Sequence, residues 1–131
     1  MNILKKSVAL LSGVLIAVTA FAGEFPDISI TEVKALVGTT KATIIDVNGT
    51  DSFNSGHVPG ALNFDVVEAN LAKVLPENKD ALIIAYCGNP RCSAYQAAAK
   101  AAEKLGYKNV KHMSAGIAGW KKAGEKTEAV K

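Results

Sequence analysis

Ala-Leu-Ile-Ile-Ala-Tyr-Cys-Gly-Asn-Pro-Arg-Cys, residues 81–92, is the stretch that decides the fold. Residues 81–86 are all apolar or aromatic and lack Gly and Pro, which predicts a strand that is buried on both faces. Gly88 and Pro90 then predict a short loop, and an alanine-rich helical segment begins at Ser93. A buried strand, a loop and a helix in this order indicate one unit of a parallel α/β sheet.

Cys87 follows the predicted strand directly and opens the loop, at the edge where parallel sheets bind their ligands. The backbone N–H groups at the start of the next helix face this loop, and the helix dipole favours negative charge there. Both effects favour the thiolate, which is the nucleophilic form of a cysteine. The alternative is that Cys87 is a small buried residue of the core, as many free cysteines are.

Outside this stretch, the chain alternates between predicted strands and predicted helices. Ser93 and Gln96 fit a capping box, so Ser93 is the predicted N-cap of the helix after the loop. The sequence predicts one α/β domain, with its core at about residues 28–124, in which a central parallel sheet of four or five strands has helices on both faces. The other predicted strands are residues 42–47, 61–64 and 109–113, and the other predicted helices are residues 32–37 (capped by Ser29 or Thr31), 66–75 and 116–122.

Residues 1–22 have the layout of a secretory signal peptide. Lys5 and Lys6 precede an apolar stretch, and Ala-Phe-Ala at residues 20–22 provides a cleavage signal. The apolar stretch is shorter than the ~20 residues that a membrane-spanning helix needs. We therefore expect cleavage after Ala22, which leaves residues 23–131 as a periplasmic or secreted domain without stable membrane insertion.

The charge of the chain excludes one class of partner. Loss of the two leader lysines lowers the formal net charge from +3 to +1, so no basic surface for nucleic acid is predicted. The two cysteines and two histidines match no zinc-binding spacing, and we expect neither a metal nor another cofactor. The lysine-rich residues 121–131 are expected to form a frayed, solvated tail.

Five short segments occur in the order and spacing of single-domain rhodanese-like proteins, and the chain resembles this family over about residues 28–124. The resemblance implies a sulfurtransferase in which Cys87 becomes a persulfide. It would take sulfane sulfur from a small anionic donor such as thiosulfate and pass it to cyanide or to a thiol, including a thiol of a partner protein. The segments are residues 44–47 (Ile-Ile-Asp-Val), 56–61 (Gly-His-Val-Pro-Gly-Ala), 86–93 (Tyr-Cys, the loop and Ser), 106–110 (Gly-Tyr-Lys-Asn-Val) and 115–120 (Ala-Gly-Ile-Ala-Gly-Trp).

Because thiosulfate is a dianion, we expect the loop to bind it through backbone amides and the Arg91 side chain, as an oxyanion hole does. Arg91 could instead be an ordinary solvent-facing loop residue. The expected substrate-binding loop consists of Gly88, Asn89, Pro90, Arg91, Cys92 and Ser93.

The chain departs from the family pattern at three places. Asn48 and Ser52 replace an Arg and a Glu that pair in the family, so both charges are lost together. Pro90 and Cys92 occupy the Gly and Arg positions of the typical loop Cys-x-x-Gly-x-Arg-Ser, and Pro90 donates no N–H. Ala115 replaces the first Gly of Gly-Gly-x-x-x-Trp. These departures predict less efficient use of thiosulfate but leave the persulfide chemistry intact.

Several polar residues have both a structural and a functional interpretation. Cys92 could pack beneath the helix start, attack a Cys87 persulfide, or close a disulfide with Cys87 if their Cα atoms lie within about 7 Å. Asp46 could tune the site or cap the turn that follows its strand, and His57 could position a proton near the site or serve the fold. His112 and Trp120 are expected to be structural.

Three other functions remain as alternatives. A phosphatase or arsenate reductase of the same fold needs Cys-x₅-Arg. Ser93 stands where that Arg would be, so the sequence disfavours this alternative. A thiol–disulfide protein would use Cys87 and Cys92 as its redox pair. A non-catalytic sulfur-carrier or binding module would use the loop to recognise a partner.

Overall fold

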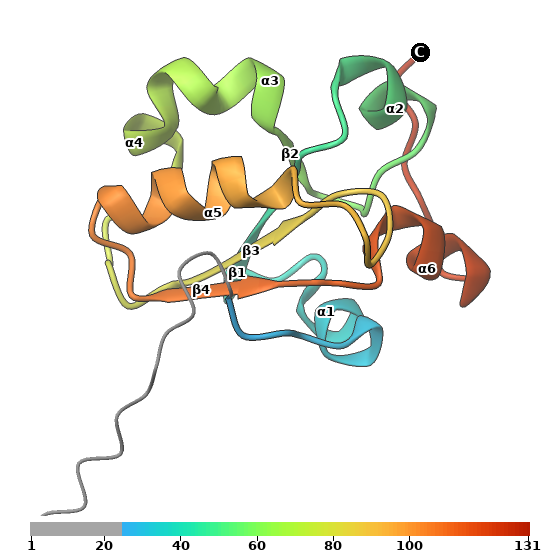
Figure 1. Ribbon diagram of the computed structural model, residues 1–131, viewed down its shortest axis with the longest axis horizontal. Coiled ribbons are helices and arrows are strands. Elements are labelled where there is room, and N and C mark those ends of the chain that lie inside the picture. The colour runs from blue at the N-terminus through green and yellow to red at the C-terminus, as the bar shows by residue number, and fades with distance from the viewer. Residues whose placement is uncertain (1–24) are drawn as a thin grey trace, which may run out of the picture.

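A four-stranded parallel sheet forms the centre of the computed structural model, which describes residues 25–131 (Figure 1). The strand order is β2-β1-β3-β4 and every pairing is parallel. This confirms the predicted α/β domain, with four strands. The strands are β1 (Ala42–Asp46), β2 (Leu62–Asn63), β3 (Leu82–Tyr86) and β4 (Asn109–His112).

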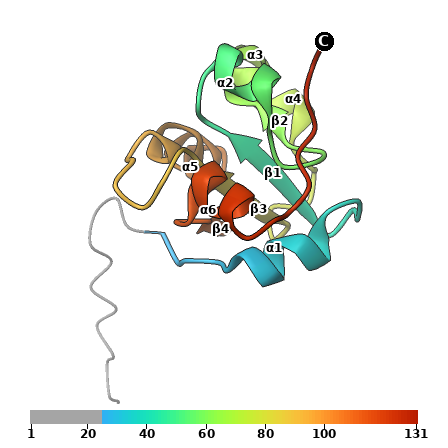
Figure 2. The same ribbon diagram turned by 90° about the vertical axis from the view of Figure 1, so that its right-hand side faces the viewer.

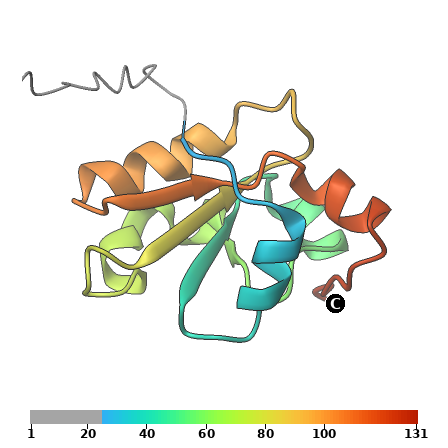
Figure 3. The same cartoon turned by 90° about the horizontal axis from the view of Figure 1, so that it is seen from below.

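Helices cover both faces of the sheet, as predicted (Figures 1 and 3). Figure 3 looks onto the face that α1 covers, and α6 packs into the same apolar cluster as α1. The opposite face is covered by α3, α4 and α5. The helices are α1 (Ile30–Leu36), α2 (Thr50–Ser55), α3 (Phe64–Val67), α4 (Leu71–Val74), α5 (Tyr95–Lys104) and α6 (Gly116–Lys122), and a 3-10 turn, η1, spans Glu68–Asn70.

β3 belongs to both layers of the core, which explains its uninterrupted apolar sequence. Ile83 and Ala85 pack against α5, whereas Ile84 and Tyr86 pack toward α1 and α6, because side chains alternate along a strand. All four side chains are fully buried. The end of this strand is therefore a rigid position from which to start a loop.

Two predicted helices differ from the structure. The helix expected at residues 66–75 begins at Phe64, where the Asn63 side chain accepts a hydrogen bond from the Asp65 N–H, and η1 interrupts it before Leu71. This break buries Phe64 and Leu71 together and leaves Val66 68% exposed.

Ser93 is not the N-cap of α5. The helix begins at Tyr95, Ala94 precedes it, and no side chain caps it. The Cys92 N–H donates to the carbonyl of Asn89 at 3.0 Å, which closes a turn within the loop, and the Ser93 carbonyl accepts a hydrogen bond from the Gln96 N–H at 3.1 Å. The helix therefore begins later than the capping-box pattern indicates.

The prediction of a frayed tail is wrong. Residues 124–130, called the C-terminal strap below, leave α6 and run past α2 (Figure 2). His57 and Glu128 exchange two backbone hydrogen bonds of 2.9 Å, and the Val130 N–H donates to the carbonyl of Asn54 at 2.9 Å. The Trp120 indole N–H also donates to the carbonyl of Lys126. The three bonds to Asn54 and His57 satisfy backbone groups that a free tail would expose to water.

The expected leader, residues 1–22, and the cleavage after Ala22 lie outside the described residues. Between residues 25 and 131, no helix combines the length and the apolar character needed to cross a bilayer.

Candidate active site

Cys87 lies immediately after Tyr86, the last residue of β3, and its side chain is 1% exposed. It belongs to the apolar cluster on the α5 side of the sheet, which also contains Tyr95. The loop that it opens leads to the start of α5. The structure thus places Cys87 at the carboxyl edge of a parallel sheet, where such folds bind ligands.

Cys87 and Cys92 form a disulfide, with their Cα atoms 6.2 Å apart. This separation is within the usual range for disulfides. Cys92 is only half-buried and lies against the edge of the cluster that encloses Cys87. Residues 25–131 contain no free cysteine, so the structure represents the oxidised form of the pair.

The loop between the two cysteines uses its own polar groups to hold its shape. The Asn89 side-chain oxygen accepts a hydrogen bond from the Arg91 N–H at 2.9 Å, and the Asn89 carbonyl accepts one from the Cys92 N–H at 3.0 Å. Pro90 has no N–H to offer. Three of the backbone donors expected to bind an anion are therefore engaged or absent.

Arg91 is exposed and forms no salt bridge with any residue from 25 to 131. Asn89, Pro90 and Ser93 are exposed beside it. The guanidinium is the one fixed positive charge carried by this loop, so it is the group best placed to attract an anion to the loop.

The start of α6 is attached to the beginning of the loop. The Ile117 N–H donates to the Cys87 carbonyl and the Ala118 N–H donates to the Gly88 carbonyl, both at 2.9 Å. Gly116 has φ of +65°, and a Cβ there would lie 2.5 Å from the carbonyl carbon of Gly88. Only glycine permits this close approach. The sequence motif 115–120 contained this signal, but its structural role could not be assigned without the contact.

A buried hydrogen-bond network holds the ends of β1 and β3. The Tyr86 hydroxyl donates to a carboxylate oxygen of Asp46 at 2.6 Å and accepts from the Val58 N–H at 3.0 Å. The other Asp46 oxygen accepts from the Asn48 N–H at 2.8 Å. Burial, and then the adjacent Asp46 charge, raise the pKa of Tyr86 well above its usual range, so the hydroxyl remains a donor. The Asp46 carboxylate therefore caps the turn after β1.

Asn48 lies beside the beginning of the loop. Its side-chain oxygen would be 3.5 Å from a Cβ at Gly88. Its Nδ2 is buried and has no hydrogen-bond partner among residues 25–131. The sequence distinguished Asn48 only as a departure from the family pattern, because the approach of Gly88 is a long-range contact.

His57 is placed by α2 and the C-terminal strap. Its Nδ1 lies 2.8 Å from the Phe53 carbonyl, and its ring stacks on Phe53 with the centroids 3.7 Å apart. Its Nε2 lies 3.8 Å from a carboxylate oxygen of Glu128. None of these partners belongs to the cysteine loop, so the structure favours the structural interpretation of His57.

His112 and Trp120 are both buried. The His112 ring stacks on Tyr95, with the centroids 3.3 Å apart, and so supports the first residue of α5. Burial lowers the pKa of His112, and the charge of Asp27 opposes this effect only in part. Trp120 fills the core between α6 and α1, as the sequence indicated.

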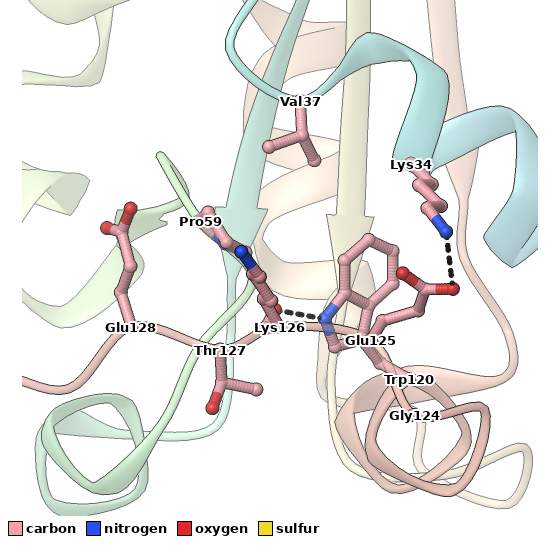
Figure 4. Close-up of a pocket in the computed structure, with 9 residues that line it drawn as sticks. All are labelled: Lys34, Val37, Pro59, Trp120, Gly124, Glu125, Lys126, Thr127 and Glu128. Carbon is pink, nitrogen blue, oxygen red and sulfur yellow. Dashed lines mark hydrogen bonds and ion pairs between the residues drawn. The ribbon is translucent and has the colours of Figure 1, made fainter.

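A hollow of about 540 Å³ lies away from the cysteine loop (Figure 4). Trp120 lies between α1 and the strap, and a 3.1 Å ion pair between Lys34 and Glu125 crosses one side. None of the residues that line this hollow belongs to the loop 87–93. They are Lys34, Val37, Pro59, Trp120, Gly124, Glu125, Lys126, Thr127 and Glu128.

Within the described part of the chain, no group of three or more His, Cys, Asp or Glu side chains is arranged to hold a metal ion. Around Cys87, the reactive and charged groups of this loop are its two sulfur atoms and the Arg91 guanidinium.

Comparisons with known proteins identify a family. Residues 29–123 match the model of the rhodanese-like domain. The chain is 31% identical over 103 residues to the uncharacterized protein YibN of Escherichia coli K12, covering 76% of this chain and 68% of YibN. It is 34% identical over 85 residues to the HTH-type transcriptional regulator Rv0324 of Mycobacterium tuberculosis, a match that covers 64% of this chain but only 36% of the regulator.

Solved structures agree on the fold. The rhodanese-like domain of the Anabaena protein Alr3790 has a TM-score of 0.64 at 25% identity, with 82% of this chain and 81% of that chain covered. The single-domain sulfurtransferase RDL2 of Saccharomyces cerevisiae has a TM-score of 0.59 at 19% identity, covering 77% and 93% of the two chains. The second likeness bears on the fold alone.

Proposed function

Because the chain belongs to the rhodanese-like domain family, we propose that it is a sulfurtransferase that carries sulfur as a persulfide on Cys87. The observation that carries this proposal is the position of Cys87, which is the first residue of a loop between a central strand and α5. The donor is a small sulfane anion such as thiosulfate. The acceptor is a thiol or cyanide.

The transfer step follows from the chemistry of a thiolate. The Cys87 thiolate attacks the outer sulfur of thiosulfate, the sulfur–sulfur bond of thiosulfate breaks, and sulfite leaves with the electron pair. Arg91 attracts the incoming dianion and the departing sulfite. Since Pro90, Arg91 and Cys92 offer no unengaged backbone donors, we expect a slow reaction with thiosulfate.

The disulfide must be reduced before this chemistry can begin. Cys92 is the more exposed cysteine of the pair, so an incoming thiol attacks Cys92 and Cys87 departs as the thiolate. The protein should therefore be inactive as a sulfur acceptor in its oxidised form.

The test is intact-mass measurement of two variants after reduction, removal of the reductant and exposure to thiosulfate. Cys92→Ser should gain the mass of one sulfur atom, and Cys87→Ser should gain nothing. The reverse result, with sulfur retained on Cys87→Ser and absent from Cys92→Ser, would show that the nucleophile is wrongly assigned.

The disulfide itself favours a second candidate function, a thiol–disulfide protein that exchanges electrons without carrying sulfur. In that case the reduced wild-type protein should reduce a model disulfide in the absence of thiosulfate, and Cys92→Ser should take up no sulfur. Sulfur uptake by Cys92→Ser would contradict this candidate.

We also propose that the protein works outside the cytoplasm, on the basis of residues 1–22. Exported material should begin at or near Gly23 by N-terminal sequencing. A mature protein that retains Met1 would contradict this location.

A further inference from the structure

We propose that Cys92 resolves the Cys87 persulfide within the same chain, so that the protein reduces the sulfane sulfur of its donor to hydrogen sulfide. This inference rests on the proposed function, because it needs the persulfide to form. It identifies the acceptor as a residue of the chain and the product as sulfide.

The disulfide is the first observation that carries this inference. It shows that the Cys92 sulfur reaches the Cys87 sulfur in the folded chain, with the Cα atoms 6.2 Å apart. The reach is built into the loop, since the Asn89 carbonyl binds the Cys92 N–H and the Asn89 side chain binds the Arg91 N–H. These two bonds turn the chain back over Cys87. The attack therefore needs no rearrangement of the domain.

The second observation is the difference in burial between the two cysteines. Cys87 is 1% exposed and is enclosed by the α5 side of the core, whereas Cys92 is half-buried at its edge. An acceptor from solution must enter the loop to approach the Cys87 sulfur. Cys92 is already there, so the intramolecular reaction has the advantage of proximity.

The reaction balances in atoms and electrons. After sulfite has left, the Cys92 thiolate attacks Cys87 Sγ and forms the disulfide. The bond between Cys87 Sγ and the transferred sulfur breaks, and that sulfur leaves with the electron pair as HS⁻, which takes up a proton. The two thiols are oxidised to the disulfide while the sulfane sulfur is reduced to sulfide.

A thiol reductant completes the cycle. It attacks Cys92, the more exposed cysteine, and Cys87 leaves as the thiolate. A second thiol equivalent then releases Cys92 and leaves the reductant oxidised. The structure, with both cysteines in the disulfide, has the covalent state expected after sulfide release and before reduction.

The experiment is a single turnover with the full-length protein, reduced and freed of reductant, and then mixed with thiosulfate. The wild-type protein should release about one equivalent of sulfide and one of sulfite, and lose both thiols, because one disulfide accounts for one sulfane sulfur. Cys92→Ser and Cys92→Ala should release sulfite but no sulfide, and should keep the added sulfur until an external thiol is supplied. Agreement between the two variants separates the thiol from the packing of the side chain, and circular dichroism confirms that each is folded.

The outcomes separate the two proposals. If the Cys92 variants load sulfur but wild-type protein also retains its persulfide and releases no sulfide, this inference is overturned and the sulfurtransferase proposal stands. If the Cys92 variants release sulfide as the wild type does, Cys92 is not the acceptor. If neither wild type nor variant releases sulfite, the proposed function fails and this inference fails with it.

Discussion

The two cysteines of the disulfide are held in different ways. Cys87 follows the central strand, lies in the core, and has its carbonyl bound by the Ile117 N–H at the start of α6. Cys92 is half-buried, and its backbone N–H is bound within the loop by Asn89. The fold therefore fixes the first sulfur, whereas the residues of the loop hold the second. Changes around Cys87, called the Cys87 side below, and changes around Cys92, called the Cys92 side, should therefore differ in how much they destabilise the domain and in how they do so.

The largest expected effect is on the Cys87 side. Gly116→Ala places a Cβ 2.5 Å from the Gly88 carbonyl carbon in a backbone with φ of +65°. The clash and the strain together should lower the free energy of unfolding by about 3 kcal/mol, measured by urea denaturation. Gly124→Ala is the matched control, since φ is +78° but nothing lies within 4 Å, so its loss should be about 1 kcal/mol. Equal losses of unfolding free energy in the two variants would mean that the close contact between Gly116 and Gly88 does not contribute to stability.

The network beneath the Cys87 side gives the next effect. Tyr86→Phe removes the hydroxyl and leaves the buried Asp46 carboxylate and the Val58 N–H each short of a partner. The free energy of unfolding should fall by about 2 kcal/mol, by the same measurement. Tyr107→Phe removes a hydroxyl that donates only to the Pro76 carbonyl, and should cost about 1 kcal/mol. A larger loss at Tyr107 would contradict the importance of the Asp46–Tyr86 pair.

On the Cys92 side, the covalent bond itself can be removed. Reduction of a disulfide that spans five positions in sequence should lower the free energy of unfolding by about 2 kcal/mol, chiefly by releasing a constraint on the unfolded chain. Denaturation with and without a reductant measures the difference. Cys92→Ser should be insensitive to the reductant, and a response in this variant would place the effect elsewhere in the protein.

The smallest effect concerns the helix that follows Cys92. His112 stacks on Tyr95, and burial lowers the pKa of this histidine, so the unfolded chain binds the proton more readily than the folded chain. Stability is therefore lost as the pH falls through the usual histidine range, by less than about 1 kcal/mol between about pH 7 and pH 6. Unfolding measured across this range in wild type and in His112→Gln isolates the contribution. An unchanged slope in the variant would contradict it.

The strands could be predicted closely because their signal is local. β3 is buried on both faces, so its apolar run is continuous, and the observed strand begins one residue later than the predicted one and ends at the same residue, Tyr86. The position of Cys87 follows from that strand alone. Ser93 shows the limit of this reasoning, because the capping-box pattern made it the N-cap, whereas Ala94 precedes the helix and no side chain caps it.

The C-terminal strap could not be predicted for a different reason. Its backbone hydrogen bonds reach Asn54 and His57, which lie about seventy residues earlier in the sequence, so the composition of residues 124–130 gave no sign of them. Formation of the disulfide also could not be decided from the sequence. The two cysteines are near in sequence, but whether their Cα atoms come within bonding range depends on the path of the loop.

The position of β3 has a consequence for the dynamics of the protein. It is bonded to β1 and β4 on its two sides and covered on both faces, so its amide hydrogens should exchange with solvent only when the whole domain unfolds. The loop tip, whose residues 89–91 are exposed, should exchange through small local openings. The disulfide thus joins the residue that follows the slowest-exchanging strand to the residue that follows a faster-exchanging loop tip.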